Sequence, residues 1–289
     1  MKLQNSLFRV RLFIIPNFQK RSKAPLFRYS LFPVRLFIIP NFQKSVVSPL
    51  LTIPKPVIQT DFLVLRKMPY SETSLIVAGL SPTRGQLRLI IRGGRKIAPK
   101  QMPVVDIFRL IHVTYVEGKS GLHTWRDGEL LSSYGDVARD FGLCETAAWL
   151  ARFTLSHSVE EAECPRFFLA ARTGLKRLAE AARGHDMMPR ADGGTSHTPP
   201  PRAEHGSPAL EKKEALSFAV KNGLILVYLS ENGLLPDYPA GSAEERQLNI
   251  LIASALDHIP LPDLGAIKWR DIFTWGQTLL RSHAEENAL

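Results

Sequence analysis

The stretch Gln86–Arg92 has the clearest alternation of apolar and polar positions in the chain. In a strand, successive side chains point to opposite faces, so Leu87, Leu89 and Ile91 share one face and Arg88, Ile90 and Arg92 share the other. An apolar run precedes it at Ser74–Leu80, and a Pro- and Gly-containing turn lies between the two runs. The pattern predicts a β-hairpin with one face in a core and arginines on the other face.

Five such runs, separated by Pro- and Gly-containing turns, fill the region of residues 57–133. The predicted strands are Ile58–Arg66, Thr73–Leu80, Gln86–Arg92, Val104–Val116 and Gly121–Leu131. Five short strands favour a closed barrel over an open sheet, because closure removes exposed edges. An OB-fold is the five-stranded barrel that fits best.

From residue 136 the apolar positions recur with the spacing of helices. Two helices are expected within residues 136–184, with Pro165 in the first turn of the second, and three more at Ala209–Glu231, 243–257 and 264–283. Residues 185–208 are rich in Pro, Gly and small polar residues, which predicts a flexible loop. The expected fold class is therefore α+β, with an OB-fold barrel followed by a helical domain over residues 136–284.

Residues 1–56 contain a segment that occurs twice. Ser6–Lys20 and Ser30–Lys44 differ only at Arg9 and Pro33. Each copy has one short apolar run, far below the ~20 residues that span a membrane. Recently duplicated DNA, or translation begun upstream of the true start, explains a near-identical pair that has no structural partner. A targeting or membrane-surface role is the alternative. We expect little stable tertiary structure in this basic extension.

Charge is uneven along the chain. The whole sequence has 37 Lys and Arg against 27 Asp and Glu, a net charge of +10. Residues 56–110 hold nine basic residues against three acidic ones, whereas residues 136–289 are net acidic. A basic surface on the barrel is typical of a polyanion-binding protein. The expected phosphate contacts are Arg84, Arg88, Arg92, Arg95, Lys96 and Lys100. An ordinary hairpin with a solvated outer face is the alternative.

Motifs for catalysis and metal binding are missing from the sequence. There is no phosphate-binding loop ending in Gly-Lys-Ser/Thr, no HExxH and no GxSxG. Cys144 and Cys164 do not form a CxxC pair, so they are expected to be buried free thiols in a reducing compartment. His157 is interpreted as a surface residue. We therefore expect no enzyme activity, no cofactor and no metal.

Several segments resemble the RecO family of bacterial DNA repair proteins. Three lie in the predicted hairpin region: Tyr70–Ser74 (YSETS), Thr83–Gly85 and Arg92–Arg95 (RGGR). A fourth, Gly233–Tyr238 (GLLPDY), is similar to the family's segment at the end of a long helix. Many members carry a cysteine cluster just after this segment. Residues 238–247 contain no cysteine, so no zinc is expected.

The resemblance implies a recombination mediator. Such a protein binds single- and double-stranded DNA, anneals complementary strands, and acts with RecR and single-strand-binding protein to load RecA at gaps. It implies a cytoplasmic, nucleoid-associated protein, and a site on the helical domain for the C-terminal tail of single-strand-binding protein. Two other functions stay open from the residues: a generic OB-fold RNA- or single-strand-binding module, and a structural adaptor that binds protein only.

Overall fold

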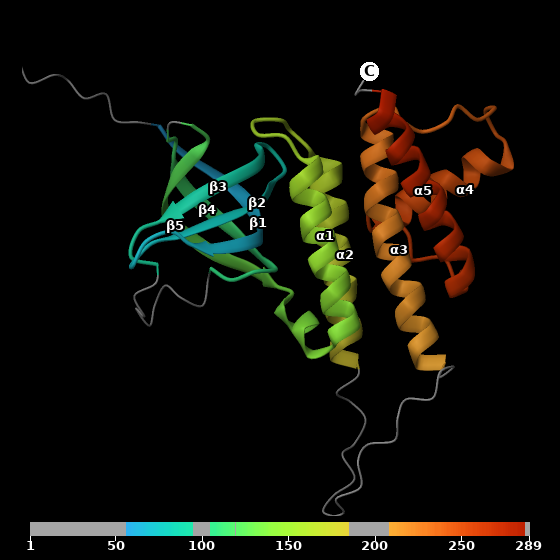
Figure 1. The fold of residues 1–289 in the computed structure, drawn as a ribbon, viewed down its shortest axis with the longest axis horizontal. Helices are drawn as coiled ribbons and strands as arrows, with labels where there is room; N and C mark the ends of the chain where they lie inside the picture. Colours follow the sequence, from blue (N-terminus) through green and yellow to red (C-terminus); the bar gives the residue numbers. More distant parts are fainter. Residues whose placement is uncertain (1–55, 95–104, 119, 185–207, 287–289) are drawn as a thin grey trace, which may run out of the picture. The chain divides into compact units, whose positions relative to one another are not determined.

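A computed structural model of the protein describes residues 56–94, 105–118, 120–184 and 208–286 (Figure 1). All described elements belong to one structural unit, Ile53–Leu289. The duplicated segments and loop residues 185–207 lie outside the described residues. The predictions made for them, and the proposed domain limits that depend on them, remain predictions.

Five strands form a closed barrel in the order β1-β2-β3-β5-β4 (Figure 1). β1 pairs antiparallel with both β2 and β4, and β3 and β5 close the barrel in parallel. The strands are β1 (Val57–Pro69), β2 (Leu75–Ser81), β3 (Gly85–Ile91), β4 (Arg109–Val116) and β5 (Leu122–Ser133). This arrangement confirms the predicted α+β class with an OB-fold barrel at the N-terminal side.

β4 starts five residues later than predicted, at Arg109 instead of Val104. Phe108 has a φ of +59°, which extended backbone does not adopt. The side chain of Asp106 accepts a hydrogen bond from the backbone N–H of Ile107, at 3.0 Å. This local hydrogen bonding and the positive φ keep the segment before Arg109 out of the strand.

The barrel interior is filled by alternate residues of each strand. Leu87, Leu89 and Ile91 are buried there, whereas Arg88 is exposed, as the alternation predicts. Aromatic rings contribute the largest volumes, with Phe62 and Tyr115 fully buried. Those two aromatic side chains are core residues and are inaccessible to a ligand.

Part of the outer barrel surface is also buried, because helices cover it. Leu63 and Leu65 on β1 and Leu80 on β2 point outward and join the core of the helical domain. β1 therefore has four consecutive buried residues, Phe62–Leu65. They point alternately into the barrel interior and into the core of the helical domain. One apolar core thus runs continuously from the barrel surface into the helices.

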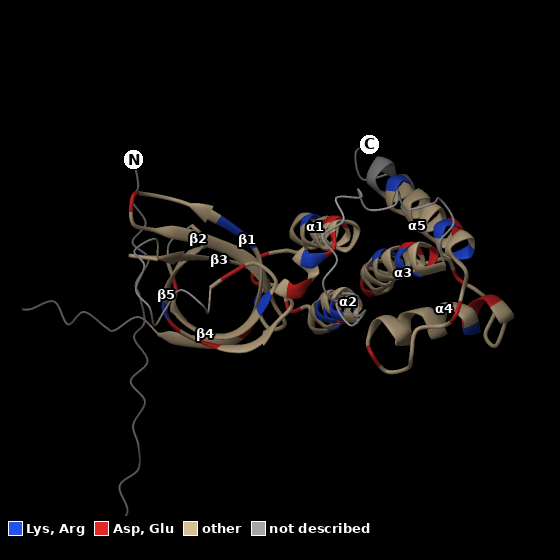
Figure 2. Ribbon diagram, turned by 90° about the horizontal axis from the view of Figure 1, so that it is seen from below, with Lys and Arg blue, Asp and Glu red and all other residues tan. Residues whose placement is uncertain are grey.

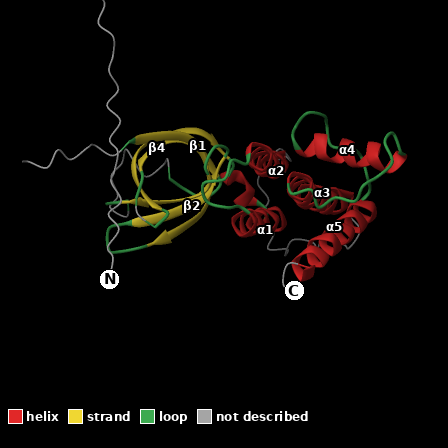
Figure 3. Cartoon of the chain, turned by 90° about the horizontal axis from the view of Figure 1, so that it is seen from above, coloured by secondary structure: helices red, strands yellow, loops and turns green. Residues whose placement is uncertain are grey.

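Helices make up the rest of the described chain. α1 and α2 lie next to the barrel, α3 lies behind them, and α4 and α5 lie on the far side of α3 (Figure 3). The helices are a 3₁₀ turn at Gly135–Arg139, α1 (Phe141–His157), α2 (Pro165–Gly184), α3 (Pro208–Glu231), α4 (Ala243–Ala255) and α5 (Ala266–Glu286). Pro165 is the first residue of α2, as predicted.

Local signals at the helix ends behave as their residue types suggest. α3 ends in a Schellman motif: Gly233 has a φ of +65°, and the N–H of Leu234 donates to the carbonyl of Leu229 at 2.8 Å. Ser242 caps α4 by accepting from the N–H of Glu245 at 3.1 Å. These contacts satisfy backbone groups that a helix end otherwise leaves unpaired.

Two side-chain interpretations need correction, and one buried contact is additional. Cys144 and Cys164 are only half-buried, and burial raises the pKa of the Cys164 thiol to about 12. His157 is partly buried, with its ring stacked on Phe153 at 4.0 Å between centroids. Asn222 is fully buried and donates to the carbonyl of Trp269 at 2.7 Å, so it joins α3 to α5. The contact of Asn222 with Trp269 has no short-range sequence signal, because the two residues lie 47 positions apart.

Candidate nucleic-acid interface

The outer face of β1, β2 and β3 is the surface where the predicted arginines gather. Two rows of paired residues form it: Arg66–Ala78–Arg88 and Met68–Ile76–Ile90. β1 ends at Pro69 and β3 at Ile91, and both of these residues pair with Leu75. Tyr70 and Arg92 therefore leave the barrel at the same end.

Two of the predicted DNA contacts are engaged in ion pairs. The Arg84 guanidinium lies 3.6 Å from the carboxylate of Glu117 in the connection after β4. The Arg88 guanidinium lies 2.7 Å from the carboxylate of Glu160, which belongs to the connection between α1 and α2. Both pairs are partly solvent-exposed, so a phosphate competes with a carboxylate at each arginine.

The α1–α2 connection is fastened to the β2–β3 turn by backbone hydrogen bonds. The N–H of Gln86 donates to the carbonyl of Val159, and the N–H of Glu161 donates to the carbonyl of Arg84, each at 3.0 Å. Cys164 N–H donates to the carbonyl of Pro82 at the same distance. The Arg88–Glu160 ion pair therefore reinforces a junction between the barrel and the helices.

The other predicted contacts divide into one free arginine and three residues without a described position. Arg92 is exposed and has no ion-pair partner among the described residues. Arg95, Lys96 and Lys100 lie outside the described residues. The three described contacts, Arg84, Arg88 and Arg92, all belong to the β2–β3 hairpin and its ends, and the set of six remains a prediction.

Arg66 and Arg126 are exposed cations of the barrel that the sequence pattern did not indicate as contacts. A bulge at Leu65 turns Arg66 outward, where simple alternation would place it inside. Arg126 is the extra residue of a second bulge, between the pairs Tyr115–Trp125 and Thr114–Asp127. Neither arginine has an ion-pair partner in the described part of the chain. Bulges shift the phase of a strand, so a strict period of two misses such residues.

Carboxylates gather on the outer face of β1, β4 and β5. Asp61 lies 2.8 Å from Nδ1 of His112, which pairs across the sheet with Glu129. Asp127 lies in the next row, opposite Thr114. The described barrel holds seven basic and six acidic side chains, and Figure 2 shows basic and acidic positions interspersed on it. The described surface of the barrel is therefore mixed in charge and is not uniformly basic.

Titratable groups inside the barrel do not contribute to this surface. Burial lowers the pKa of His123, whose ring lies 5.2 Å from that of Tyr115. Burial also raises the pKa of Tyr115. Both side chains are therefore uncharged near neutral pH. Among the described residues, no group of three His, Cys, Asp or Glu side chains is placed to hold a metal ion.

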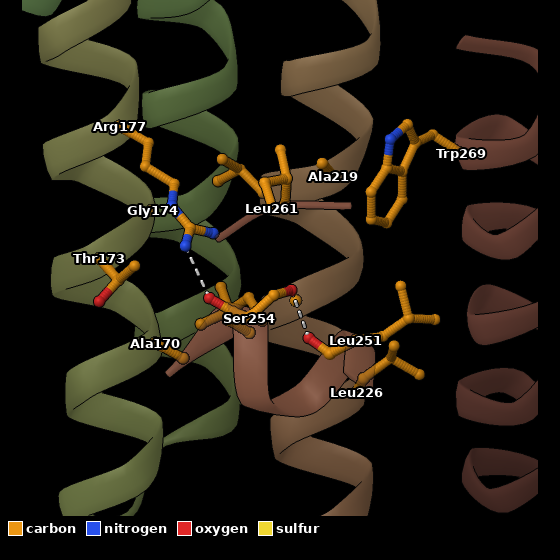
Figure 4. A pocket seen from close by; sticks show the side chains of 14 residues that line it. Ala170, Thr173, Gly174, Arg177, Ala219, Leu226, Leu251, Ser254, Leu261 and Trp269 are labelled. Atoms are coloured by element: carbon orange, nitrogen blue, oxygen red, sulfur yellow. Dashed lines mark hydrogen bonds between the residues drawn. The ribbon is translucent and has the colours of Figure 1, made fainter. Parts of the chain in front are cut away.

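A small cavity lies between α2, α3 and α4 (Figure 4). Arg177 donates to the carbonyl of Ser254 at 2.7 Å along one wall, and Trp269 forms part of another. The space is about 10 Å³, which holds at most one water molecule. We therefore interpret it as a packing feature of the helical domain. No described helix is long and apolar enough to cross a membrane.

The fold and its surface define a class: an OB-fold barrel with a partly basic outer face, joined to a helical bundle. The family described as "Recombination protein O N terminal" matches residues 56–134, which is the whole barrel. Residues 56–134 are therefore similar to the N-terminal domain of the RecO family.

Curated relatives point the same way. The DNA repair protein RecO of Bacillus velezensis is 32% identical over 116 residues, which are 40% of this chain and 45% of that protein. The protein of the same name from Bacillus subtilis is 30% identical over 118 residues, 41% of this chain and 46% of the relative. That from Geobacter metallireducens is 26% identical over 120 residues, 42% and 49% respectively. The chain spans about half the length of the curated relatives it matches.

Proposed function

We propose that the protein is a DNA repair and recombination mediator that binds DNA with its barrel and anneals complementary strands. The similarity of its barrel to the N-terminal domain of the RecO family supports this role. The observation that carries the DNA-binding part is the outer face of β1, β2 and β3, where Arg66 and Arg92 are exposed and unpaired among the described residues. The carboxylates of Asp61 and Glu129 lie further along the outer surface, opposite His112 of β4.

The DNA-binding residues of this proposal fall into three groups. Arg92, Arg66 and Arg126 contact phosphates directly, because no carboxylate of the described residues competes for them. Arg84 and Arg88 contribute only when a phosphate displaces a carboxylate. Arg95, Lys96 and Lys100 follow Arg92 in the chain and extend the basic segment. Phosphate contacts carry no base information, so sequence preference is slight.

Annealing needs no bond chemistry, so we propose no catalytic reaction, cofactor or metal. The two strands need only be held loosely while cations reduce their repulsion. By analogy with the family, the proposed partners are RecR, the C-terminal tail of single-strand-binding protein and, indirectly, RecA. Such a protein works in the cytoplasm on the nucleoid.

Annealing of complementary DNA strands coated with single-strand-binding protein tests this function. The full chain should accelerate annealing, and the variant Arg92→Ala/Arg95→Ala/Lys96→Ala should lose most of the acceleration. The variant Arg152→Ala/Lys268→Ala/Arg281→Ala removes three exposed charges from the helices and should retain it. Binding confined to RNA would support an RNA-binding module instead. No nucleic-acid binding at low salt would leave a protein adaptor.

A further inference from the structure

Among the aromatic residues of the described barrel, Tyr70 is the one with an exposed side chain. Tyr70 is 60% exposed and lies in the turn between β1 and β2. The rings of Phe62, Phe108 and Tyr115 are buried, and Trp125 packs against the barrel core. Aromatic rings are usually buried in the core. An exposed ring on a barrel proposed to bind nucleic acid is therefore a candidate to stack on a base.

The turn that carries Tyr70 is closed by its own hydrogen bonds. The N–H of Tyr70 donates to the carbonyl of Ser74 at 3.0 Å. The N–H of Ser74 donates to Oγ of Ser71 at 3.1 Å. The backbone beneath the ring is therefore already ordered, so a ligand that stacks on Tyr70 orders little additional chain.

The surface next to Tyr70 alternates apolar and cationic groups. Met68, Ile76 and Ile90 form a half-buried apolar row across three strands. Arg66 lies one row before it, and Arg92 lies at the end where Tyr70 leaves the barrel. Base faces are flat and apolar, and phosphates are anionic, so a strand with unstacked bases complements both parts of this surface. A duplex offers the phosphates only, because its base faces are hidden in the stack.

We propose that Tyr70 is a base-stacking platform, and that the strip Arg66–Met68–Ile76–Ile90–Arg92 beside it binds single-stranded DNA in preference to duplex. This inference rests on the proposed DNA-binding function and names the strand type that the face selects. The arginines attract either form of DNA, whereas the ring and the apolar row act on unpaired bases alone. Tyr70 thereby holds a single strand with its bases accessible near the cations that lower the repulsion of a second strand.

Fluorescence anisotropy with two labelled probes tests the platform. One is oligothymidylate of about 15 nucleotides, within the site sizes of OB-folds, and the other is a hairpin duplex with the same number of phosphates. Tyr70→Ala should weaken oligothymidylate binding by about 5- to 150-fold, the range for one lost base–aromatic stack. Duplex binding should not change. Tyr70→Phe keeps the ring and should bind as the unmodified chain does.

Phe141→Ala provides the matched control. Phe141 is 86% exposed at the start of α1, outside the barrel, so its removal should leave binding of both probes unchanged. Photocrosslinking with oligothymidylate that contains 5-iodouracil gives a second readout, and the crosslink should map to Tyr70.

The results separate this inference from the function on which it rests. If the unmodified chain binds neither probe, the proposed function fails and the platform fails with it. If the unmodified chain binds DNA and Tyr70→Ala weakens neither probe, or weakens both equally, only the platform is overturned. Selective loss of oligothymidylate binding, restored by Tyr70→Phe, supports it.

Discussion

Gly85 lies at the junction between the barrel and the helices with a φ of +61°. A Cβ at this position would lie 2.2 Å from the carbonyl oxygen of Val159 and 2.5 Å from that of Ala162. Glycine is therefore required at this position for two reasons: its backbone conformation and the close approach of another backbone segment. Gly93, on the loop after β3, has a φ of +73°, but apart from its chain neighbours no heavy atom of the described residues lies within 4 Å of its Cβ position.

Substitution of Gly85 and of Gly93, each by alanine, gives a controlled test of this junction. Gly93→Ala should lower the free energy of unfolding by about 1–2 kcal/mol, the cost of a left-handed conformation for an L-residue. Gly85→Ala should cost about 3 kcal/mol or more, because the α1–α2 connection must also shift and lose hydrogen bonds of about 1 kcal/mol each. Urea denaturation of both variants measures the difference. Equal losses would show that the close approach does not matter.

At the residue scale, sequence patterns predict the face of a strand on which a side chain lies better than the residue that it contacts. The alternation in β3 correctly placed Arg88 on the outer face. It did not reveal Glu160, because that carboxylate comes from a connection between helices that folds back onto the barrel. Arg66 was missed for a different reason, since one inserted residue in β1 reverses the alternation beyond it. Bulges have no reliable short-range sequence signal.

At the scale of elements, the start of α1 joins two helices through a charged cap. Oδ1 of Asp140 accepts from the N–H of Leu143 at 3.1 Å, and its other oxygen lies 2.6 Å from the ammonium group of Lys213 on α3. Burial of Asp140 works against its ionisation, but the hydrogen bonds from Lys213 and Leu143 outweigh this effect. The pKa of Asp140 is therefore lowered.

Asp140→Asn tests this cap, because asparagine still caps a helix but cannot form the ion pair. A lowered pKa in the folded state stabilises the protein above the unfolded value of about 3.9. The variant should therefore be less stable than the unmodified chain by about 1 kcal/mol at pH 7. The gap should shrink as the pH falls below that unfolded value, through the folded pKa. Urea denaturation across this range measures it, and a gap independent of pH would contradict the ion pair.

Most helices and strands were predictable because their ends carry local signals. Pro165 begins α2, Gly233 ends α3 and Ser242 caps α4. β1 was harder to interpret, since its run of buried residues obscures the period of two. The predicted start of β4 is wrong, because the backbone of Phe108 departs from the extended conformation. Such conformations depend on tertiary contacts that short-range patterns do not contain.

At the scale of the whole molecule, one core links the barrel and the helices. Leu63 and Leu80 on the outer barrel belong to the same core cluster as Leu143 and Leu150 of α1. The two parts should therefore unfold together in a single transition. Far-ultraviolet and near-ultraviolet circular dichroism of a variant that begins after the duplicated segment would follow this unfolding transition. The two denaturation curves should coincide.

Leu80→Ala sharpens this prediction. Removing a fully buried leucine from a shared core costs about 2–5 kcal/mol, and both signals should shift to lower urea concentration by the same amount. A shift in only one of the two signals would show that barrel and helices are independent.

The distribution of charge was the least predictable property of the whole molecule. The count of basic residues assigns an excess of positive charge to residues 56–110. It did not show that Glu117 and Glu160 pair with two of the arginines, or that other carboxylates face away from them. Net charge is a sum, whereas binding depends on which cations remain unpaired on one face.

The salt dependence of single-stranded DNA affinity tests the central claim most directly. Each phosphate contact adds about 0.7 to the slope of log affinity against log salt concentration for single strands. We predict that Arg66→Ala/Arg92→Ala/Arg126→Ala lowers this slope by about 2, while the helical variant Arg152→Ala/Lys268→Ala/Arg281→Ala leaves it unchanged. Equal slopes for all three proteins would contradict DNA binding by the outer face of the barrel.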